Sequence, residues 1–187
     1  FDALARSRGL TLTVAGDAQP GEVAVALDVE MFERALTNVL ANALKFTSVG
    51  AVSLRWTFTE THFRVAVQDS GIGIDAADLP FVFDRFRRSS AAKRHAGTGI
   101  GLALVKEIVT LHHGAVEVRS RRGEGTVFEL AFPTTPADVG RASLWTTSTR
   151  EGAPVVTAVV AARGTDDIHA WNLHAAQSAD GSRASVL

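Results

Sequence analysis

Along most of the chain, apolar side chains recur either at every second residue, as in a strand, or at intervals of three and four residues, as in a helix. Apolar residues recur at helical spacing through residues 32–44, and Asp28 stands where a helix N-cap is expected. A second helical pattern covers residues 100–111. Residues 52–67 and 116–132 alternate apolar and polar side chains, as half-buried strands do. The two periods together predict an α+β fold in which a mixed sheet carries its helices on one face.

Weaker patterns extend this arrangement to the N-terminus. Residues 1–9 are predicted to be the end of a helix that Gly9 closes, and residues 10–14 and 23–27 have the β-branched alternation of short strands. The turns between these strands are expected at Gly16, Asp17, Pro20 and Gly21. The N-terminal segment is therefore expected to add strands to the same sheet.

The composition changes after Pro133 and Pro136 to Ala, Ser, Thr and Gly with scattered charge, and periodicity is lost except near residues 155–160. We therefore place a domain boundary near Thr134. Residues 10–134 form the main domain, and residues 135–187 form a C-terminal extension. This extension is either a mobile tail, which the composition favours, or a strand that docks on a neighbouring domain.

Composition and charge exclude several classes of protein. The 187 residues suffice for one domain and an appendage but not for two large domains. With 19 basic and 20 acidic residues, the chain lacks the basic surface that nucleic-acid binding requires. The longest apolar run, residues 154–162, is too short to insert in a membrane, and the absence of Cys suits a reducing cytoplasm. Because the chain starts at Phe1 without a signal-peptide pattern, we expect it to be part of a longer polypeptide.

A polar stripe borders the apolar face of the first long helix. Asn38, Asn42 and Lys45 lie at positions i, i+4 and i+7 and therefore point in one direction. An Asn amide oxygen is a suitable ligand for Mg²⁺, and Lys45 is placed to meet phosphate charge. The alternative is that all three are ordinary solvent-facing residues of an amphipathic helix. The helix alone does not distinguish the two interpretations.

An acidic residue ends the strand that precedes a glycine-rich turn. Asp69 continues the alternation of the apolar residues before it, so its carboxylate is expected on the buried face of the sheet. There it needs a donor, and the exocyclic amine of adenine is one, while Gly71 and Gly73 would let a flat base approach the backbone. Thr126 shares this parity on its own strand and is a second candidate for holding the base. Taken alone, the motif is more often a simple turn after a strand.

A second glycine-rich segment precedes the second long helix. Gly97, Gly99 and Gly101 stand where unpaired N–H groups at a helix start can bind phosphate. The segment lacks the Lys-Ser or Lys-Thr ending of a P-loop. The preceding residues 89–96 also differ from the strand of a dinucleotide-binding fold.

An aromatic and basic cluster lies just before this loop. Its members are Phe81, Phe83, Arg85, Phe86, Arg87 and Arg88. The simpler interpretation is that the rings are core residues and the arginines a solvated surface. Beside a triphosphate, an Arg would instead balance the charge that develops during phosphoryl transfer.

In this order, the four segments resemble the N, G1, F and G2 boxes of the catalytic domain of sensor histidine kinases, over about residues 10–133. The resemblance implies a two-layer α/β sandwich, the Bergerat or GHKL fold shared with gyrase, the heat-shock ATPase and mismatch-repair ATPases. It also implies that residues 1–9 are the end of a linker or of the second helix of a phosphoacceptor domain.

The family also implies ligands and roles for the residues of the boxes. ATP and Mg²⁺ are the implied cofactors, with Asn42 as the metal ligand and Asn38, Lys45 and Arg88 as catalytic residues. Phe83-Asp84-Arg85-Phe86 would anchor a mobile lid formed by residues 89–98. The residues implied in ATP binding are Asn38, Asn42, Lys45, Asp69, Gly71, Gly73, Phe83, Phe86, Arg88, Gly97, Thr98, Gly99, Ile100, Gly101, Leu102 and Thr126.

The residue at position 38 bears on the type of reaction. Hydrolysing members of this fold carry a Glu there that activates water, whereas the amide of Asn38 cannot act as a general base. The expected reaction is therefore transfer of the γ-phosphoryl group to a His. None of the six His residues precedes an acidic residue on a predicted helix, so we expect the acceptor on a separate dimerisation and phosphoacceptor domain of the parent protein. A response regulator would then act downstream.

Other functions stay open at this point. The enzymatic alternatives are a protein-serine kinase or an autonomous ATPase of the same fold, and the non-enzymatic one is a degenerate nucleotide-binding docking module. Two departures from the family pattern are Ala96, where a further Gly is frequent, and His113, where a Gly often follows a His. The resemblance implies a cytoplasmic domain, whose parent protein can carry a membrane anchor elsewhere.

Overall fold

The computed structural model describes residues 1–17, 23–25, 27–87, 98–136, 156–158 and 171–173. The helices are α1 (Asp2–Ser7), α2 (Val29–Phe46), the 3-10 helix η1 (Leu79–Phe81) and α3 (Gly101–Leu111). The strands are β1 (Thr11–Asp17), β2 (Val23–Val25), β3 (Ala51–Phe58), β4 (His62–Asp69), β5 (Ala115–Arg121) and β6 (Gly125–Pro136). Two further strands, β7 (Val156–Ala158) and β8 (Trp171–Leu173), pair with each other.

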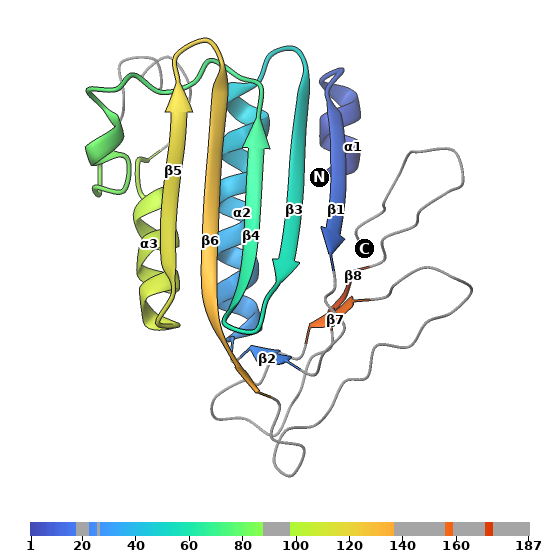
Figure 1. The fold of residues 1–187 in the computed structure, drawn as a ribbon. Coiled ribbons are helices and arrows are strands. Elements are labelled where there is room, and N and C mark those ends of the chain that lie inside the picture. The colour runs from blue at the N-terminus through green and yellow to red at the C-terminus, as the bar shows by residue number, and fades with distance from the viewer. Residues whose placement is uncertain (18–22, 26, 88–97, 137–155, 159–170, 174–187) are drawn as a thin grey trace.

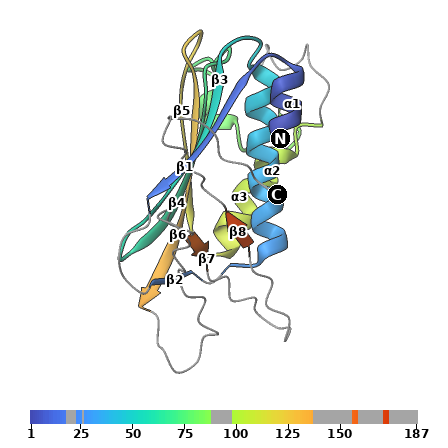
Figure 2. The same cartoon turned by 90° about the vertical axis from the view of Figure 1, so that its right-hand side faces the viewer.

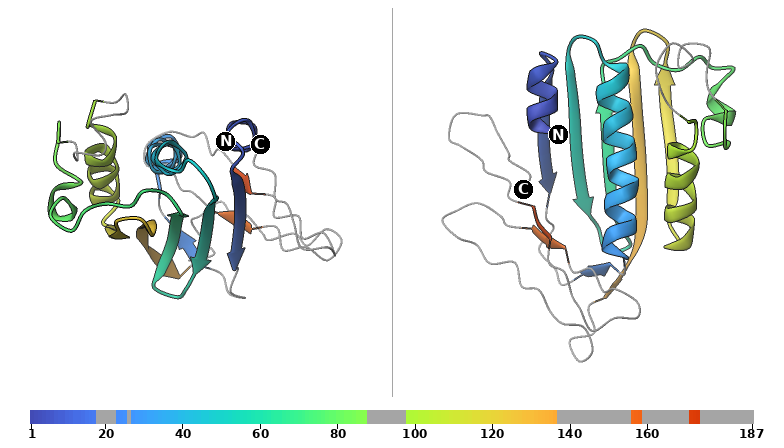
Figure 3. Two further views of the ribbon diagram at one scale, coloured as in Figure 1. Left: turned by 90° about the horizontal axis from the view of Figure 1, so that it is seen from above. Right: turned by 180° about the vertical axis from the view of Figure 1, so that it is seen from behind.

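The main sheet is mixed and is covered by helices on one face (Figure 1). Its strand order is β1-β3-β4-β6-β2, with β5 also paired to β6. The β1–β3 pair is parallel, and the other pairs in this sheet are antiparallel. Figure 2 and both views of Figure 3 show α1, α2 and α3 on the same side. The predicted α+β fold with two layers is confirmed.

Local sequence explains where the two long helices begin and end. The side chain of Asp28 accepts a hydrogen bond from the backbone N–H of Met31 at 2.9 Å and so caps α2, as predicted. Helix α3 ends at Leu111 and is followed by a left-handed residue, His113, with φ of 57°. The N–H of His113 donates to Thr110, and the N–H of Gly114 donates to Val109. This is the arrangement that usually selects Gly, so the sequence departure at position 113 falls on a strained conformation.

The core lies between the sheet and the helices and is filled unevenly. At the end where β4 begins, four aromatic rings pack together: those of Phe32, Phe58, Phe63 and Phe132. The centroids of Phe58 and Phe63 are 4.4 Å apart, and those of Phe32 and Phe132 are 5.6 Å apart. Towards the other end of β4, where Asp69 lies, a smaller ring contact joins Phe83 and Phe128, with centroids 6.2 Å apart.

One predicted turn is wrong. Gly16 and Asp17 belong to β1 and pair in parallel register with Trp56 and Thr57. A Cβ atom at Gly16 would lie 1.8 Å from the Trp56 ring. Glycine is therefore needed here because the buried indole lies against the backbone, and not because the chain turns. Pro20 and Gly21 lie outside the described residues.

Strand β6 continues to Pro136, past the boundary expected near Thr134, because residues 134–136 pair with β2. In the described part of the chain, no helix combines the length and apolar character needed to cross a membrane.

Candidate functional site

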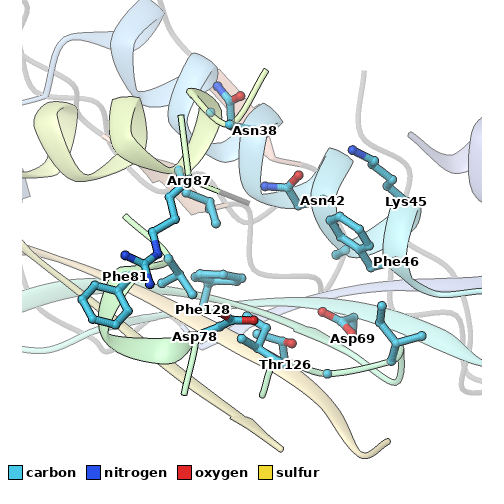
Figure 4. A pocket seen from close by; sticks show the side chains of 18 of the residues that line it. Asn38, Asn42, Lys45, Phe46, Asp69, Asp78, Phe81, Arg87, Thr126 and Phe128 are labelled. Atoms are coloured by element: carbon cyan, nitrogen blue, oxygen red, sulfur yellow. The ribbon is translucent and has the colours of Figure 1, made fainter. Parts of the chain in front are cut away.

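A cavity of about 270 Å³ opens between α2, the start of α3, the last residue of β4 and the first residues of β6 (Figure 4). From α2 and the strands it is lined by Asn38, Asn42, Ala43, Lys45, Phe46, Asp69, Thr126 and Phe128. From the connecting segments and the start of α3 it is lined by Ile72, Gly73, Ile74, Asp78, Phe81, Val82, Arg87, Thr98, Gly99, Gly101 and Leu102. Four segments that are separate in the sequence thus meet at one place.

Helix α2 presents the predicted polar stripe to this cavity. Its buried positions, among them Val39 and Leu44, pack into the core, which leaves Asn38, Asn42 and Lys45 at the cavity wall. The Asn38 amide donates to the backbone carbonyl of Arg34 at 2.7 Å. The Asn42 side chain makes no hydrogen bond to any described residue, so its amide oxygen is available to a ligand.

The start of α3 lies directly against this stripe. A Cβ atom at Gly101 would lie 2.6 Å from Oδ1 of Asn38, so any larger residue would have to displace the Asn38 side chain. Packing against α2 therefore requires glycine at position 101, whereas phosphate binding by this segment stays a prediction. Gly99 also lines the cavity, whereas Gly97 lies outside the described residues.

Asp69 is the buried acid of the cavity. It is 7% exposed, as its predicted parity requires. Burial raises the pKa of Asp69, because a charged carboxylate is poorly solvated there, while hydrogen bonds from the backbone N–H groups of Gly71 and Thr126 partly offset this effect. The Gly71 N–H lies 2.8 Å from Oδ1 of Asp69. A buried carboxylate with one oxygen already engaged can use the other to read a donor on a ligand.

Thr126 lies directly opposite Asp69, across the β4–β6 ladder, and is 6% exposed. Its hydroxyl is 2.9 Å from the Ser120 hydroxyl, which donates to the Gly125 carbonyl and accepts from the Ile74 N–H, both at 2.8 Å. Ser120 therefore fixes the position of Thr126 and ties the segment after β4 to β5. The alternating pattern on β5 places Ser120 on this face, but the sequence interpretation did not select it.

The two glycines after Asp69 have reasons internal to the protein. A Cβ atom at Gly71 would lie 2.4 Å from the Phe46 carbonyl oxygen. Gly73 has φ of 65°, and a Cβ atom there would lie 2.1 Å from the carbonyl oxygen of Arg121. Gly73 lines the cavity and Gly71 does not. Contact between either glycine and a bound base stays a prediction.

The aromatic and basic cluster is divided by the structure. Phe83 packs edge-on against Phe128 with ring centroids 6.2 Å apart, and Phe86 is 74% exposed. Neither ring lines the cavity. The Phe86 N–H donates to the Gly99 carbonyl at 2.9 Å. The lid predicted for residues 89–98 lies outside the described residues except for Thr98 and stays a prediction.

Arg87 enters the cavity wall, and its guanidinium lies 3.7 Å from the centroid of the Phe81 ring. Arg88, the arginine chosen from the sequence, lies outside the described residues. The neighbouring Arg85 forms an ion pair with Glu107 on α3.

Most of the predicted binding residues meet at the cavity. Those that line it are Asn38, Asn42, Lys45, Asp69, Gly73, Thr98, Gly99, Gly101, Leu102 and Thr126. Ile100 is 40% exposed and does not line it. The sequence interpretation missed Asp78 and Arg87, the two further charged residues of the wall. Arg87 belonged to the basic cluster, but no sequence pattern identified Asp78.

The donor set fits Mg²⁺ held together with a phosphorylated ligand. No group of three or more His, Cys, Asp or Glu residues suited to a metal ion occurs among the described residues. A magnesium ion needs few protein ligands when phosphate oxygens and water complete its octahedron, and the free amide oxygen of Asn42 supplies a hard one. Lys45 and Arg87 also line the cavity and add positive charge to it.

Comparisons with known proteins agree with this geometry. The family model described as histidine kinase-, DNA gyrase B- and HSP90-like ATPase matches residues 27–136. The sensor histidine kinase CusS of Escherichia coli O157:H7 is 42% identical over 136 residues, which are 71% of this chain and 27% of CusS. The chain thus spans about a quarter of that relative.

Two solved structures share the fold. The mycobacterial sensor histidine kinase MprB is 31% identical with a TM-score of 0.62, over 72% of this chain and 91% of the MprB chain. Full-length ShkA in complex with AMPPNP is 26% identical with a TM-score of 0.63, over 73% of this chain and 28% of ShkA. Since the family model covers residues 27–136, and with them all the strands and helices around the cavity, this chain belongs to the histidine kinase-, DNA gyrase B- and HSP90-like ATPase family.

Proposed function

We propose that this chain is the ATP-binding catalytic domain of a two-component sensor histidine kinase. Its reaction is transfer of the γ-phosphoryl group of ATP to a histidine on a separate dimerisation and phosphoacceptor domain, as the first step of a phosphorelay. One observation carries the proposal: Asp69 and Asn42, a buried carboxylate and a free carboxamide, line the same cavity. A nucleotide needs both, one for its base and one for its metal-bound phosphates.

The base is held at the sheet. Asp69 accepts a hydrogen bond from the exocyclic amine of adenine, and the Thr126 hydroxyl lies on the opposite strand as a second polar contact. Phe128 adds an apolar surface to the same wall. Burial excludes water from Asp69, which strengthens its hydrogen bond to the ligand.

The phosphates are held between α2 and the start of α3. Asn42 would hold Mg²⁺, which, when bound, neutralises charge on the phosphate oxygens during transfer. Lys45 and Arg87 contribute further positive charge from the wall, and Arg88 is proposed to reach the phosphates as well. The N–H groups at the start of α3 lack helical partners and face the same space, which favours phosphate.

Asn38 favours transfer over hydrolysis. Its amide is held by a hydrogen bond to Arg34 and by the approach of Gly101, and an amide cannot accept the proton of an attacking water. The protein therefore contributes position and charge rather than a general base. The acceptor histidine comes from another domain of the parent, and a response regulator receives the phosphoryl group next. ATP use places this domain on the cytoplasmic side of any membrane.

The direct test combines the chain with a supplied phosphoacceptor domain and labelled ATP. We expect label on the acceptor domain that is labile to acid and stable to base, as phosphohistidine is. Steady release of inorganic phosphate without labelled acceptor would favour the ATPase alternative. Absence of ATP binding would favour the docking module.

Asn42→Ala supplies the matched variant, because Ala keeps α2 helical. We expect it to lose Mg²⁺-dependent ATP binding and transfer. Thr37→Ala, at an exposed position of the same helix, is the control and should retain both. Retention of Mg²⁺ dependence by Asn42→Ala would contradict the metal role.

A further inference from the structure

Asp78 has a side chain that local structure does not use. It is the N-cap residue of η1, where an Asp carboxylate normally accepts an N–H from the first turn. Here the carboxylate makes no capping bond, and no described residue pairs with it. It lines the nucleotide cavity instead.

The backbone rather than the side chain holds Asp78 in this position. Its N–H donates to the Asp75 carbonyl at 2.9 Å, and its own carbonyl accepts from the Phe81 N–H at 3.0 Å. Pro80 lies in the first turn of η1 and fixes the local backbone further. The carboxylate is therefore presented to the cavity by a folded turn.

Asp75, three residues earlier, provides a contrast. It is exposed, does not line the cavity, and forms an ion pair with Arg122 at 3.2 Å. The same short segment thus carries one acid that faces solvent and one that faces the ligand site.

The position of Asp78 within the cavity limits which groups of a bound nucleotide its carboxylate can contact. In Figure 4 its side chain is drawn towards Thr126 and Phe128, whereas Lys45 is at the opposite side of the cavity. A carboxylate accepts hydrogen bonds only, and it repels phosphate. The neutral donors of a ribonucleotide beyond its base are the two neighbouring hydroxyls of the ribose.

We propose that Asp78 accepts hydrogen bonds from the ribose hydroxyls and makes the site selective for ribonucleotides over deoxyribonucleotides. This inference rests on the proposed function, since it assumes the base at Asp69 and the metal at Asn42. A carboxylate that binds a ribose 2′-hydroxyl is an established solution in other nucleotide folds. A site built to bind a hydroxyl discriminates strongly against a ligand that lacks it, because its acceptor is then left unpaired.

The test measures dissociation constants of ATP, 2′-deoxyATP and 3′-deoxyATP for three proteins: wild type, Asp78→Ala and Asp75→Ala. We expect wild type and Asp75→Ala to bind ATP about tenfold or more tightly than at least one deoxy analogue. Asp78→Ala should bind all three with nearly equal affinity. The ratio between nucleotides is the informative quantity, because loss of a negative charge would change the binding of every triphosphate alike.

Each outcome either supports or overturns the proposed contact between Asp78 and the ribose. Equal affinity of the wild type for ATP and both analogues would overturn the ribose role while leaving ATP binding intact. Discrimination that persists in Asp78→Ala would overturn it as well. Failure of the wild type to bind any of the three would overturn the proposed function and this inference with it. Thermal unfolding of each variant separates loss of selectivity from loss of fold.

Discussion

Replacing Asp69 by Asn tests the base-binding assignment with the least change of shape. The Asn amide oxygen can keep the hydrogen bond from the Gly71 N–H, now 2.8 Å long. Its amide nitrogen, a donor, then stands where the carboxylate accepted from adenine, so a donor faces a donor. Loss of a hydrogen bond to a charged group costs about 1.5–3 kcal/mol. At about 1.4 kcal/mol per factor of ten, the affinity for ATP should fall about 10- to 150-fold.

The assay is calorimetric titration of ATP and GTP at neutral pH with Mg²⁺ present. GTP carries a carbonyl oxygen where ATP carries the amine. The Asn donor should therefore lower the affinity for ATP and raise the affinity for GTP relative to that for ATP. Asp75→Asn is the control and should bind both nucleotides as the wild type does. Equal losses for ATP and GTP, or an unchanged affinity for ATP, would refute the reasoning.

The same variant should not lose stability at neutral pH. Because burial raises the pKa of Asp69 above its ordinary value of 3.8, this carboxyl group is protonated more readily in the folded protein than in the unfolded chain. Its contribution to stability is present below that value and is lost as pH rises through the raised pKa. Asn carries no such cost, so Asp69→Asn should unfold at no lower urea concentration than wild type at pH 7. Any advantage should vanish below about pH 3.8, and a variant clearly less stable at pH 7 would contradict this account.

Three further tests, which use four substitutions, address the backbone and the helix ends, and each is measured by urea unfolding. Gly73→Ala should lower the free energy of unfolding more than Gly123→Ala does. Both glycines have positive φ, which alone costs another residue about 1–2 kcal/mol, but only at Gly73 would the added Cβ meet a carbonyl oxygen, 2.1 Å away. Equal losses of stability in the two variants would contradict this contact. Asp28→Ala should destabilise the protein by about 1 kcal/mol through loss of the α2 cap, and no change would contradict the cap. His113→Gly should stabilise it by up to about 1 kcal/mol, because φ there is 57°, and a destabilised variant would show that the ring contributes more than the strain costs.

The sequence alone determined the two long helices, the strands β3 to β6 and the direction of their side chains. The period of 3.6 fixed which face of α2 carries Asn38 and Asn42, and the period of two fixed that Asp69 and Thr126 are buried. The cap at Asp28 also followed from residue type. These properties depend on neighbours within a few positions, so local patterns are sufficient to predict them.

Only the tertiary structure decided which of these side chains share a cavity. Asp69 meets Thr126 through the β4–β6 register, and Asn38 meets Gly101 because α3 packs on α2. Asp78 joins them through a turn whose backbone bonds leave its carboxylate unused. Gly16, expected in a turn, is explained by an indole forty residues away in the chain, at Trp56. Contacts between distant segments depend on how the whole core fills its volume, and no short pattern of residues encodes that.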